Sequence, residues 1–301
     1  MDTPSFAPGA RRGPTPPAWL RLLRPPNLVT AAADVVAGFA VAGLPDWGRL
    51  ALLAPAGVLL YAAGVALNDV CDAELDAVER PERPIPSGRI TPRRAAALAF
   101  GCLAAGVALA LAASPTSGMV AAALAVCIVL YDAWAKGRPV AGPAVMASCR
   151  GLNLLLGLSA SPILLQQRWA VAVVPTLYIA AVTVVSLGEV QGARRTPAVA
   201  ALALLGASIA GLPCLAFALG GSALWSGLFA ALPLGLVAPA YLRCAGSPSP
   251  ALAGAAVRAG VLSLIALNAA IAAGFGGVYI GAAILAAAPP ARALARVFSV
   301  T

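Results

Sequence analysis

The sequence predicts an all-α integral membrane protein, from its composition and from the length of its apolar runs. Hydrophobic residues make up 61% of the 301 residues and charged residues only 10%, whereas about a quarter of the residues in a soluble domain are charged. Apolar runs of about 20 residues, the length that a helix needs to cross a bilayer, recur along the chain. We therefore expect one bundle of transmembrane helices without a soluble domain.

Ten apolar runs mark the expected helices in order along the chain. They cover residues 28–44, 50–67, 95–113, 118–135, 140–165, 169–188, 198–219, 222–242, 255–273 and 276–291. The last two runs flank Gly274, Gly276 and Gly277, so they form either two spans or one long or broken pair. The bundle is therefore expected to contain about nine helices, with ten as the alternative.

Basic residues gather on one side of the expected membrane. They lie at Arg11–Arg24, Arg80–Arg94, Lys136–Arg138 and Arg194–Arg195, whereas the opposite loops carry Arg49 and Arg168. Because cytoplasmic loops are enriched in Lys and Arg, we expect the first side to be cytoplasmic, in a bacterial inner membrane. The net charge of +9 then reports topology and a phosphate-facing surface. Aromatic residues do not interleave with the basic ones, so no nucleic-acid partner is expected.

The chain divides into two regions. Residues 1–26 are rich in Pro, Gly and Arg and lack an apolar core, which is typical of a disordered segment and not of a signal peptide. We therefore expect residues 1–26 to form a disordered cytoplasmic tail. Residues 27–301 are expected to form a single transmembrane domain.

Acidic residues concentrate directly after the second apolar run. Six of the eleven acidic residues lie within residues 68–84. If this stretch is helical, Asn68, Asp72 and Asp76 recur every four residues, and Asp69 lies three residues before Asp72, so all four share one face. Carboxylates so close together need counter-charge, either from divalent cations, which prefer oxygen ligands, or from arginines.

Arginines follow this acidic cluster at once. Arg80, Arg83 and Arg89 lie within the next loop, and a guanidinium group binds phosphate through two parallel hydrogen bonds. Carboxylates, a metal ion and arginines in one place indicate a diphosphate ligand. The chain contains no histidine, which removes the commonest general base and the commonest haem and zinc ligand.

A later loop repeats the order of residues found in this one. Thr91-Pro92 begins an alanine-rich run after the acidic stretch, and Thr196-Pro197 begins another after Glu189. Thr is a favoured N-cap and Pro a favoured first helical residue. Because Glu189 is the only acidic residue after Asp132, its position favours two pseudo-repeated halves that share a cavity. The alternative is that Thr-Pro simply begins both helices.

These motifs resemble those of the UbiA superfamily of intramembrane prenyltransferases. The family's N-D-x-x-D-x-x-x-D motif is similar to Asn68, Asp69, Asp72 and Asp76, and its R-P-x-R-P-I-P-S-G stretch is similar to residues 80–88. Leu23-Arg-Pro-Pro-Asn27 also resembles the family's first helix. The resemblance covers at least residues 20–200, and it implies a UbiA-type bundle of about nine or ten transmembrane helices around a central cavity that opens sideways to lipid.

The resemblance also implies the chemistry of the site. Two aspartate-rich regions would hold Mg²⁺ and the diphosphate of an isoprenoid donor. The implied metal ligands are Asn68, Asp69, Asp72, Asp76 and Glu189, and the implied catalytic residues are Asp69, Asp72 and Asp76. The implied substrate contacts are Asn27, Arg80, Arg83, Tyr131 and Lys136. For the last two, an interfacial anchor and a topology signal are the alternatives.

The second aspartate-rich region departs from the family pattern. The family shows D-x-x-x-D, whereas this chain reads Glu189-Val-Gln-Gly192-Ala193. The second carboxylate is therefore missing, which weakens or abolishes one metal position, although Glu189 could still hold Mg²⁺ through water. This altered motif, together with Ser148-Cys-Arg-Gly-Leu-Asn153, is similar to a less typical branch, the UbiA-like proteins called EboC.

Polar residues inside the expected spans point to a polar cavity. Arg150 and Asn153 lie one turn apart within an apolar run. An Arg at membrane depth costs several kcal/mol unless it faces a polar environment. Both residues are therefore predicted to line the cavity and to bind substrate, as a phosphate or acceptor contact. Asp34 in the first run is expected to be functional or to be paired within the cavity.

The predicted function is Mg²⁺-dependent transfer of an isoprenyl group from a polyprenyl diphosphate to a hydrophobic, electron-rich acceptor within the bilayer. Growing charge on the leaving diphosphate would be stabilised by fixed cations. Asp34, Asp72 and Asp132 are all candidates to take the acceptor's proton. The alternative function is non-catalytic binding or translocation of an isoprenoid or lipid-linked substrate, which Ala193 supports.

Overall fold

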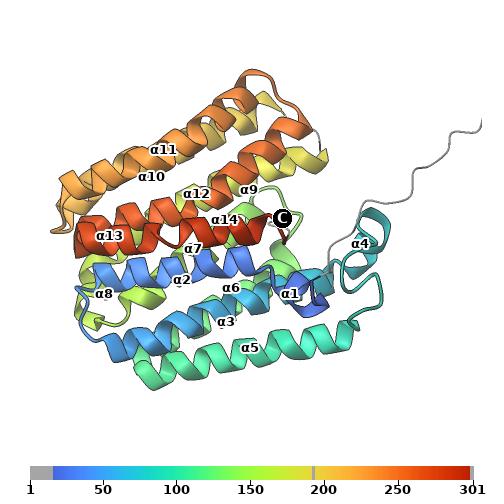
Figure 1. Ribbon diagram of the computed structural model, residues 1–301, viewed down its shortest axis with the longest axis horizontal. Coiled ribbons are helices and arrows are strands. Elements are labelled where there is room, and N and C mark those ends of the chain that lie inside the picture. Colours follow the sequence, from blue (N-terminus) through green and yellow to red (C-terminus); the bar gives the residue numbers. More distant parts are fainter. Residues whose placement is uncertain (1–15, 192–193, 299–301) are drawn as a thin grey trace, which may run out of the picture.

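The computed structural model describes residues 16–191 and 194–298, except for the side chains of residues 188–191. Every regular element in this part of the chain is a helix, and the long helices run side by side (Figure 1). The elements are α1 (Ala18–Leu23), α2 (Pro25–Val41), α3 (Trp47–Cys71), α4 (Ala73–Glu79), α5 (Pro92–Ala113), α6 (Pro115–Leu130), η1 (Tyr131–Ala135), α7 (Ala141–Leu158), α8 (Pro162–Arg168), η2 (Trp169–Ala172), α9 (Val173–Gln191), α10 (Arg195–Ala218), α11 (Ala223–Gly246), α12 (Pro250–Gly276), α13 (Val278–Leu285) and α14 (Ala288–Ala295).

Each expected apolar run corresponds to a helix or to a pair of consecutive helices. Eight segments of the described chain are long and apolar enough to cross a membrane, and α2 is a shorter apolar helix. The 18-residue α7 matches the run that contains Arg150. The all-α prediction is confirmed, and the described chain contains ten apolar helical segments, which is the upper of the two expected counts.

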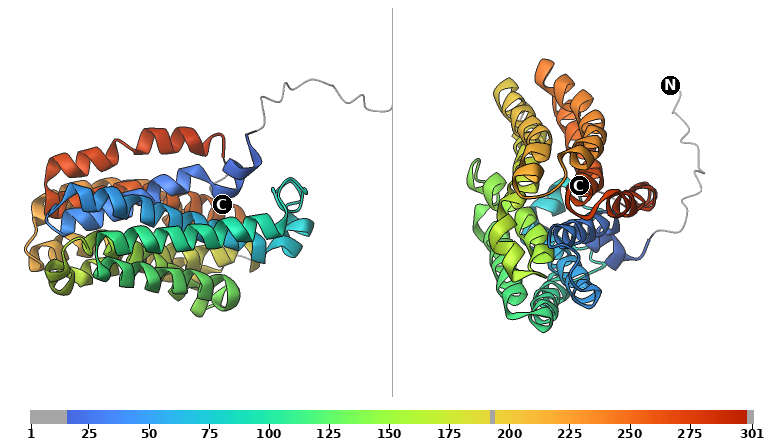
Figure 2. Two further views of the ribbon diagram at one scale, coloured as in Figure 1. Left: turned by 90° about the horizontal axis from the view of Figure 1, so that it is seen from below. Right: turned by 90° about the vertical axis from the view of Figure 1, so that its left-hand side faces the viewer.

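The tenth segment exists because the chain turns back at Gly277. This residue has a φ of 82°, a left-handed conformation that glycine adopts without a steric cost. Helix α13 then returns along α12, so that a Cβ on Gly281 would lie 2.8 Å from the Cβ of Ala273. Figure 2 shows α13 and α14 along one side of the bundle. The glycines of this region therefore separate two helices and do not bend one.

The expected disordered tail is corrected for residues 16–26. Helix α1 covers Ala18–Leu23 and α2 already begins at Pro25. Leu22 is completely buried and belongs to a small apolar cluster with Ala66 of α3 and Ala95 of α5. Its apolar contact explains why this segment is ordered. Residues 1–15 lie outside the described part of the chain.

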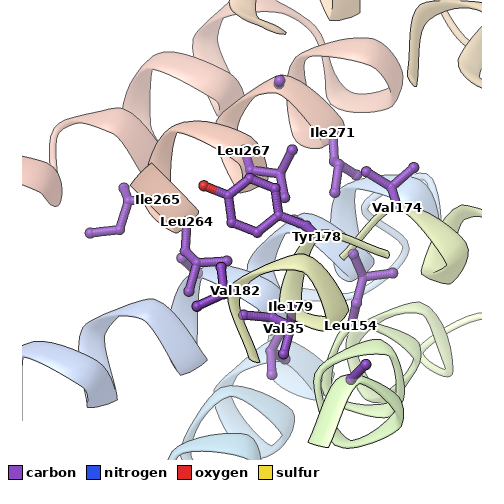
Figure 3. Packing of buried hydrophobic residues seen from close by; sticks show 14 of the residues in the cluster. Val35, Leu154, Val174, Tyr178, Ile179, Val182, Leu264, Ile265, Leu267 and Ile271 are labelled. Carbon is purple, nitrogen blue, oxygen red and sulfur yellow. The ribbon is translucent and has the colours of Figure 1, made fainter. Parts of the chain in front are cut away.

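The centre of the bundle is formed by α2, α7, α9 and α12. These helices contribute Val35, Leu154, Tyr178 and Leu267, each fully buried in one continuous apolar core. Figure 3 shows these side chains together with their neighbours on α9 and α12. Helices α10 and α11 pack on each other and lie along the outer edge of the bundle (Figure 1). The core therefore fixes the relative positions of the four central helices.

Helices α2 and α7 approach each other closely through two glycines. A Cβ on Gly38 would lie 1.9 Å from the carbonyl oxygen of Leu154, and a Cβ on Gly157 would lie 2.0 Å from that of Val35. Only glycine fits at such distances, as is common where membrane helices touch. The close contact brings the polar side chains of both helices together.

Candidate functional site

A cavity of about 290 Å³ opens between the helices at the end of the bundle that carries the acidic loop. Its polar lining residues are Arg24, Asn27, Tyr61, Asn68, Tyr131, Asp132, Arg150, Asn153, Thr183 and Ser186. Its walls are otherwise apolar and include Val65, Ile128, Ile179 and Leu264. Ile179 and Leu264 also belong to the core in Figure 3. The cavity is therefore an apolar chamber with a small number of fixed polar groups.

The acidic stretch forms the rim of this cavity, but it is not one continuous helix. Helix α3 ends at Cys71, and Asp72, with φ −90° and ψ 3°, separates it from α4. Helical hydrogen bonds over four residues continue on both sides of the break, from the Asp72 nitrogen to the Asn68 oxygen at 3.0 Å and from the Asp76 nitrogen to the Asp72 oxygen at 2.8 Å. Asp69 and Asp76 are nearly fully buried. The expectation of one continuous helix is therefore corrected to the end of the long helix α3 followed by the short helix α4, with Asp72 between them.

Basic side chains surround the carboxylates of this rim. Arg83 contacts Asp76 at 2.6 Å and Asp69 at 3.4 Å, and Arg24 contacts Asp69 at 2.7 Å. These three contacts join the start of α2, the end of α3, helix α4 and the following loop. Buried carboxylates are stable only with such counter-charge. The rim is therefore a preassembled set of alternating acids and bases.

The end of α6 adds a second group of polar residues. Its last turn, Tyr131–Ala135, is π-helical, a geometry that is frequent at functional sites. Tyr131 and Asp132 line the cavity, and the Asn68 amide donates a hydrogen bond to Asp132 Oδ1 at 3.2 Å. Lys136, directly after this turn, forms an ion pair with Asp72. The rim therefore draws on α3 and α6 together.

A second polar cluster lies deeper, where α2, α3, α7 and α12 meet. Arg150 Nε lies 2.7 Å from Asp34 Oδ2, and the amides of Asn153 and Asn268 donate to the same carboxylate at 3.0 and 2.7 Å. The Arg150 guanidinium also lies 5.8 Å from the centre of the Tyr61 ring. Tyr61 precedes Asn68 by two helical turns, so this cluster is roughly 10 Å further into the bundle.

Most predicted site residues come together in this structure. Asn27, Asn68, Tyr131, Arg150 and Asn153 line the cavity. Asp69, Asp72, Asp76, Arg83 and Lys136 are not among the lining residues; they form the ion pairs beside the cavity, which connect to its lining through Arg24. Arg80 differs from them because it is exposed at the end of α4 and forms no ion pair with the described residues. Glu189 lies in the last turn of α9, but its side chain lies outside the described part of the structure, as do residues 192–193.

The structure adds site residues that were not predicted. Arg24 lines the cavity and pairs with Asp69, and it lies in the Leu23-Arg-Pro-Pro-Asn27 stretch that carried part of the family resemblance. Asn268 is a polar residue within an apolar span, which is itself a signal of function or pairing. Tyr61 was indistinguishable from an ordinary membrane aromatic by sequence alone.

The donor atoms of the rim fit a hard divalent cation. The amide oxygen of Asn68 and the carboxylates of Asp72 and Asp132 are oxygen donors of the kind that Mg²⁺ prefers. In residues 16–298, within the described side chains, no three His, Cys, Asp or Glu residues form a metal cage. Mg²⁺ typically keeps several waters and binds through one or two carboxylates together with substrate phosphates. The rim therefore suits Mg²⁺ that binds together with a diphosphate.

Comparison with known proteins gives one family. The model of the UbiA prenyltransferase family matches residues 28–251. A digeranylgeranylglyceryl phosphate synthase from Methanopyrus kandleri is 43% identical over 142 residues, which are 46% of this chain and 52% of that protein. The chain thus spans about half the length of the curated relatives it matches. The similarity to the EboC branch stays a prediction.

Solved structures share the fold. A UbiA homologue from Aeropyrum pernix superimposes with a TM-score of 0.67 at 17% identity, over 81% of this chain and 96% of that one. A UbiA homologue from Archaeoglobus fulgidus, bound to GPP and Mg²⁺, gives a TM-score of 0.53 at 16% identity, over 92% and 99% of the two chains. With its helical bundle, its matching family model and its long apolar spans, this chain is a multi-pass integral membrane protein of the UbiA prenyltransferase family.

Proposed function

We propose that this protein transfers an isoprenyl group from a polyprenyl diphosphate to a hydrophobic, electron-rich acceptor within the membrane, in a Mg²⁺-dependent reaction. The observation that carries the proposal is the cavity itself, in which a rim of paired acids and bases leads into apolar walls. Such a chamber matches a donor with an anionic head and an apolar tail.

The rim residues would hold the diphosphate. Asn68, Asp69, Asp72 and Asp76, with Glu189, are the proposed Mg²⁺ ligands, and bound Mg²⁺ would supply Lewis-acid stabilisation of the leaving group. Arg83 and Lys136 would contact diphosphate oxygens, with Arg24 as a further basic group in the cavity lining. Arg80 remains a candidate only if its exposed loop closes over the donor.

The chemical step would follow from this arrangement. The bond between the allylic carbon and the diphosphate oxygen breaks, and its electron pair leaves with the diphosphate, where fixed positive charge stabilises it. The allylic cation is then captured by an electron pair of the acceptor, which afterwards loses a proton. The apolar cavity walls would keep water away from the cation.

The deeper cluster would position the acceptor. Arg150 and Asn153 line the inner part of the cavity, roughly two helical turns from the diphosphate end. Asp34 holds Arg150 in place, so Asp34 would act as a positioning residue and not as the acceptor's base. Tyr131, at the rim, would lie against the donor.

The acceptor is proposed from the matching relatives. The name of the matching relatives, digeranylgeranylglyceryl phosphate synthase, makes a glyceryl phosphate lipid the first acceptor to test. The loops that carry the rim are proposed to face the cytoplasm, because basic residues gather there. The curated relatives are archaeal and give no support for the bacterial inner membrane expected from the sequence.

A turnover measurement tests the proposal. Purified protein is supplied with geranyl, farnesyl or geranylgeranyl diphosphate, Mg²⁺ and a glyceryl phosphate lipid or a mixed acceptor extract, and released diphosphate is measured. We expect release that depends on both Mg²⁺ and acceptor, and that Asp72→Ala abolishes. Substantial release by Asp72→Ala would contradict the assignment. Tight Mg²⁺-dependent donor binding without release would favour the alternative, a protein that binds or translocates isoprenoid lipids.

A further inference from the structure

Asp132 is the buried carboxylate in the described part of the chain that forms no direct ion pair, although the positive charge of Lys136 acts on it from a distance. Four aspartates are buried there, and three of them, Asp34, Asp69 and Asp76, lie within 2.7 Å of an arginine nitrogen. Asp132 forms no ion pair among the described residues, because Lys136 pairs with Asp72 instead. A buried charge of this kind is costly without a counter-ion. A bound cation would supply the missing positive charge.

The position of Asp132 is set by helix geometry. Leu124, Ile128 and Asp132 follow one another at intervals of four residues, so they share one face of the helix, and all three line the cavity. The π-helical turn begins at Tyr131 and lets both Tyr131 and Asp132 reach the cavity. Asp132 therefore presents its carboxylate where the apolar wall meets the rim.

Asp132 also orients a proposed metal ligand. It accepts a hydrogen bond from the amide nitrogen of Asn68 at 3.2 Å. This contact occupies the nitrogen side of the amide, so the oxygen of Asn68 is the atom left for a cation. Amide and carboxylate oxygens side by side are a suitable pair of ligands for Mg²⁺.

The second aspartate-rich region has one carboxylate fewer than the family motif. The second aspartate-rich region ends in Ala193 where the family motif has an acid. Helix α9, which carries this region, contributes Thr183 and Ser186 to the same cavity as Asp132. We propose that Asp132 is a carboxylate ligand of the divalent cation at the rim, which would supply an acid in a chain whose second region has alanine at position 193 in its sequence. The inference rests on the proposed function.

Direct measurement of metal affinity tests this role without turnover. Mn²⁺ binding to the purified full-length chain is titrated by electron paramagnetic resonance, in the presence of geranyl S-thiolodiphosphate, which does not ionise readily. We expect Asp132→Asn to weaken Mn²⁺ binding by at least roughly 10- to 100-fold, because losing a residue that only holds a ligand already costs that much. Asp132→Glu keeps the charge and should retain most of the affinity. Asp46→Asn, which keeps the α3 N-cap at the opposite end of the bundle, is the matched control.

The outcomes separate this inference from the proposed function. If Asp72→Asn weakens Mn²⁺ binding and Asp132→Asn retains the wild-type Kd, Asp132 is not a ligand and only the inference fails. If Asp132→Asn lowers turnover at an unchanged Kd, Asp132 acts on the acceptor, and the inference is again overturned. If the wild-type protein binds no Mn²⁺ with the donor analogue, the proposed function itself fails. Melting temperatures and gel-filtration profiles in detergent show whether Asp132→Asn is folded. If it is misfolded, Mn²⁺ binding by Asp132→Glu, which keeps the charge, is compared with the wild type instead, and a lost affinity in a folded Asp132→Glu protein with wild-type geometry elsewhere would overturn the inference.

Discussion

Arg150 and Asp34 form a fully enclosed ion pair at the inner end of the cavity. Removing one partner of a buried pair leaves an uncompensated charge and typically costs about 3–5 kcal/mol. We therefore expect Asp34→Asn to lower the unfolding temperature in detergent strongly. The double variant Asp34→Asn/Arg150→Met should be less destabilised than the single one, because it removes the stranded charge. Equal losses in both would mean that the stranded charge of Arg150 is not the cause of the destabilisation.

Lys136 and Arg138 are two basic residues of the same loop with different surroundings. Lys136 pairs with Asp72 at the rim, whereas the Arg138 guanidinium lies 4.0 Å above the Trp134 ring, away from the cavity lining. We expect Lys136→Met to lower kcat by about 100-fold or more, as for other lost transition-state contacts. Arg138→Met should leave the rate of diphosphate release nearly unchanged. If both variants lost a similar share of the rate of diphosphate release, the two charges would instead act by keeping this loop on the cytoplasmic side of the membrane.

The residues of the rim show how far single side chains could be predicted. The N-D-x-x-D-x-x-x-D spacing indicated Asn68 and its aspartates, because residues so close along the chain stay close in space even across the break at Asp72. It did not indicate Arg24, which reaches the same carboxylates from another helix. Asp34 and Asn268 lie far apart in sequence and meet through a hydrogen bond of 2.7 Å. No pattern within one helix predicts such a pair.

At the level of elements, the contact between α2 and α7 is the most constrained packing of the bundle. A methyl group on Gly157 would meet the backbone of Val35 at 2.0 Å, so the helices would have to separate. We expect Gly157→Ala to destabilise the protein by about 1–3 kcal/mol, the usual cost of overpacking, and to disturb the Asp34–Arg150 pair.

A matched substitution tests whether this effect comes from packing. A Cβ on Gly206, within α10, would meet no atom within 4 Å. Gly206→Ala should therefore be neutral or should stabilise the protein by up to about 1 kcal/mol, because alanine favours the helix. Thermal unfolding of both variants in detergent gives the comparison. Equal melting temperatures for the two would contradict the close packing of α2 and α7.

The element boundaries were predictable where local chemistry determines them. Thr91 caps α5 through a hydrogen bond from the Arg94 nitrogen at 3.4 Å, as expected from Thr-Pro. The second Thr-Pro behaves differently, since α10 already begins at Arg195 and Thr196 lies inside it. The proposed repeat of two halves therefore stays a prediction. The break at Asp72 was also not predicted from the sequence, because the same i, i+4 spacing fits one helix or two consecutive helices.

For the whole molecule, the distribution of charge predicts the orientation in the membrane. Arg89 is exposed in the loop after α4, and Gln166 is exposed in α8 on the opposite end. In a background in which the six cysteines are replaced, Arg89→Cys should react with a membrane-impermeant maleimide only when the cytoplasmic face is accessible, and Gln166→Cys only from the other face. The reverse pattern would contradict the proposed cytoplasmic position of the rim.

The sequence by itself determined the class of the protein and predicted one group of residues of the candidate site. In lipid, a single apolar run of spanning length pairs its backbone N–H and C=O groups within itself only as a helix. The spacing of Asn68, Asp69, Asp72 and Asp76 is likewise a local pattern. Each apolar run corresponds to a helix or a pair of helices in the described chain, because a helix forms its backbone hydrogen bonds within itself. These features depend on residues that are neighbours along the chain.

Only the tertiary structure decided which helices surround the cavity and which polar residues share it. The close approach of α2 and α7 through Gly38 and Gly157 brings Asp34 to Arg150, and the return of α6 brings Asp132 to Asn68. Such contacts depend on side-chain packing between helices that are distant in sequence. A polar residue within an apolar run can be recognised from the sequence, but the packing of the whole bundle determines which residue it contacts.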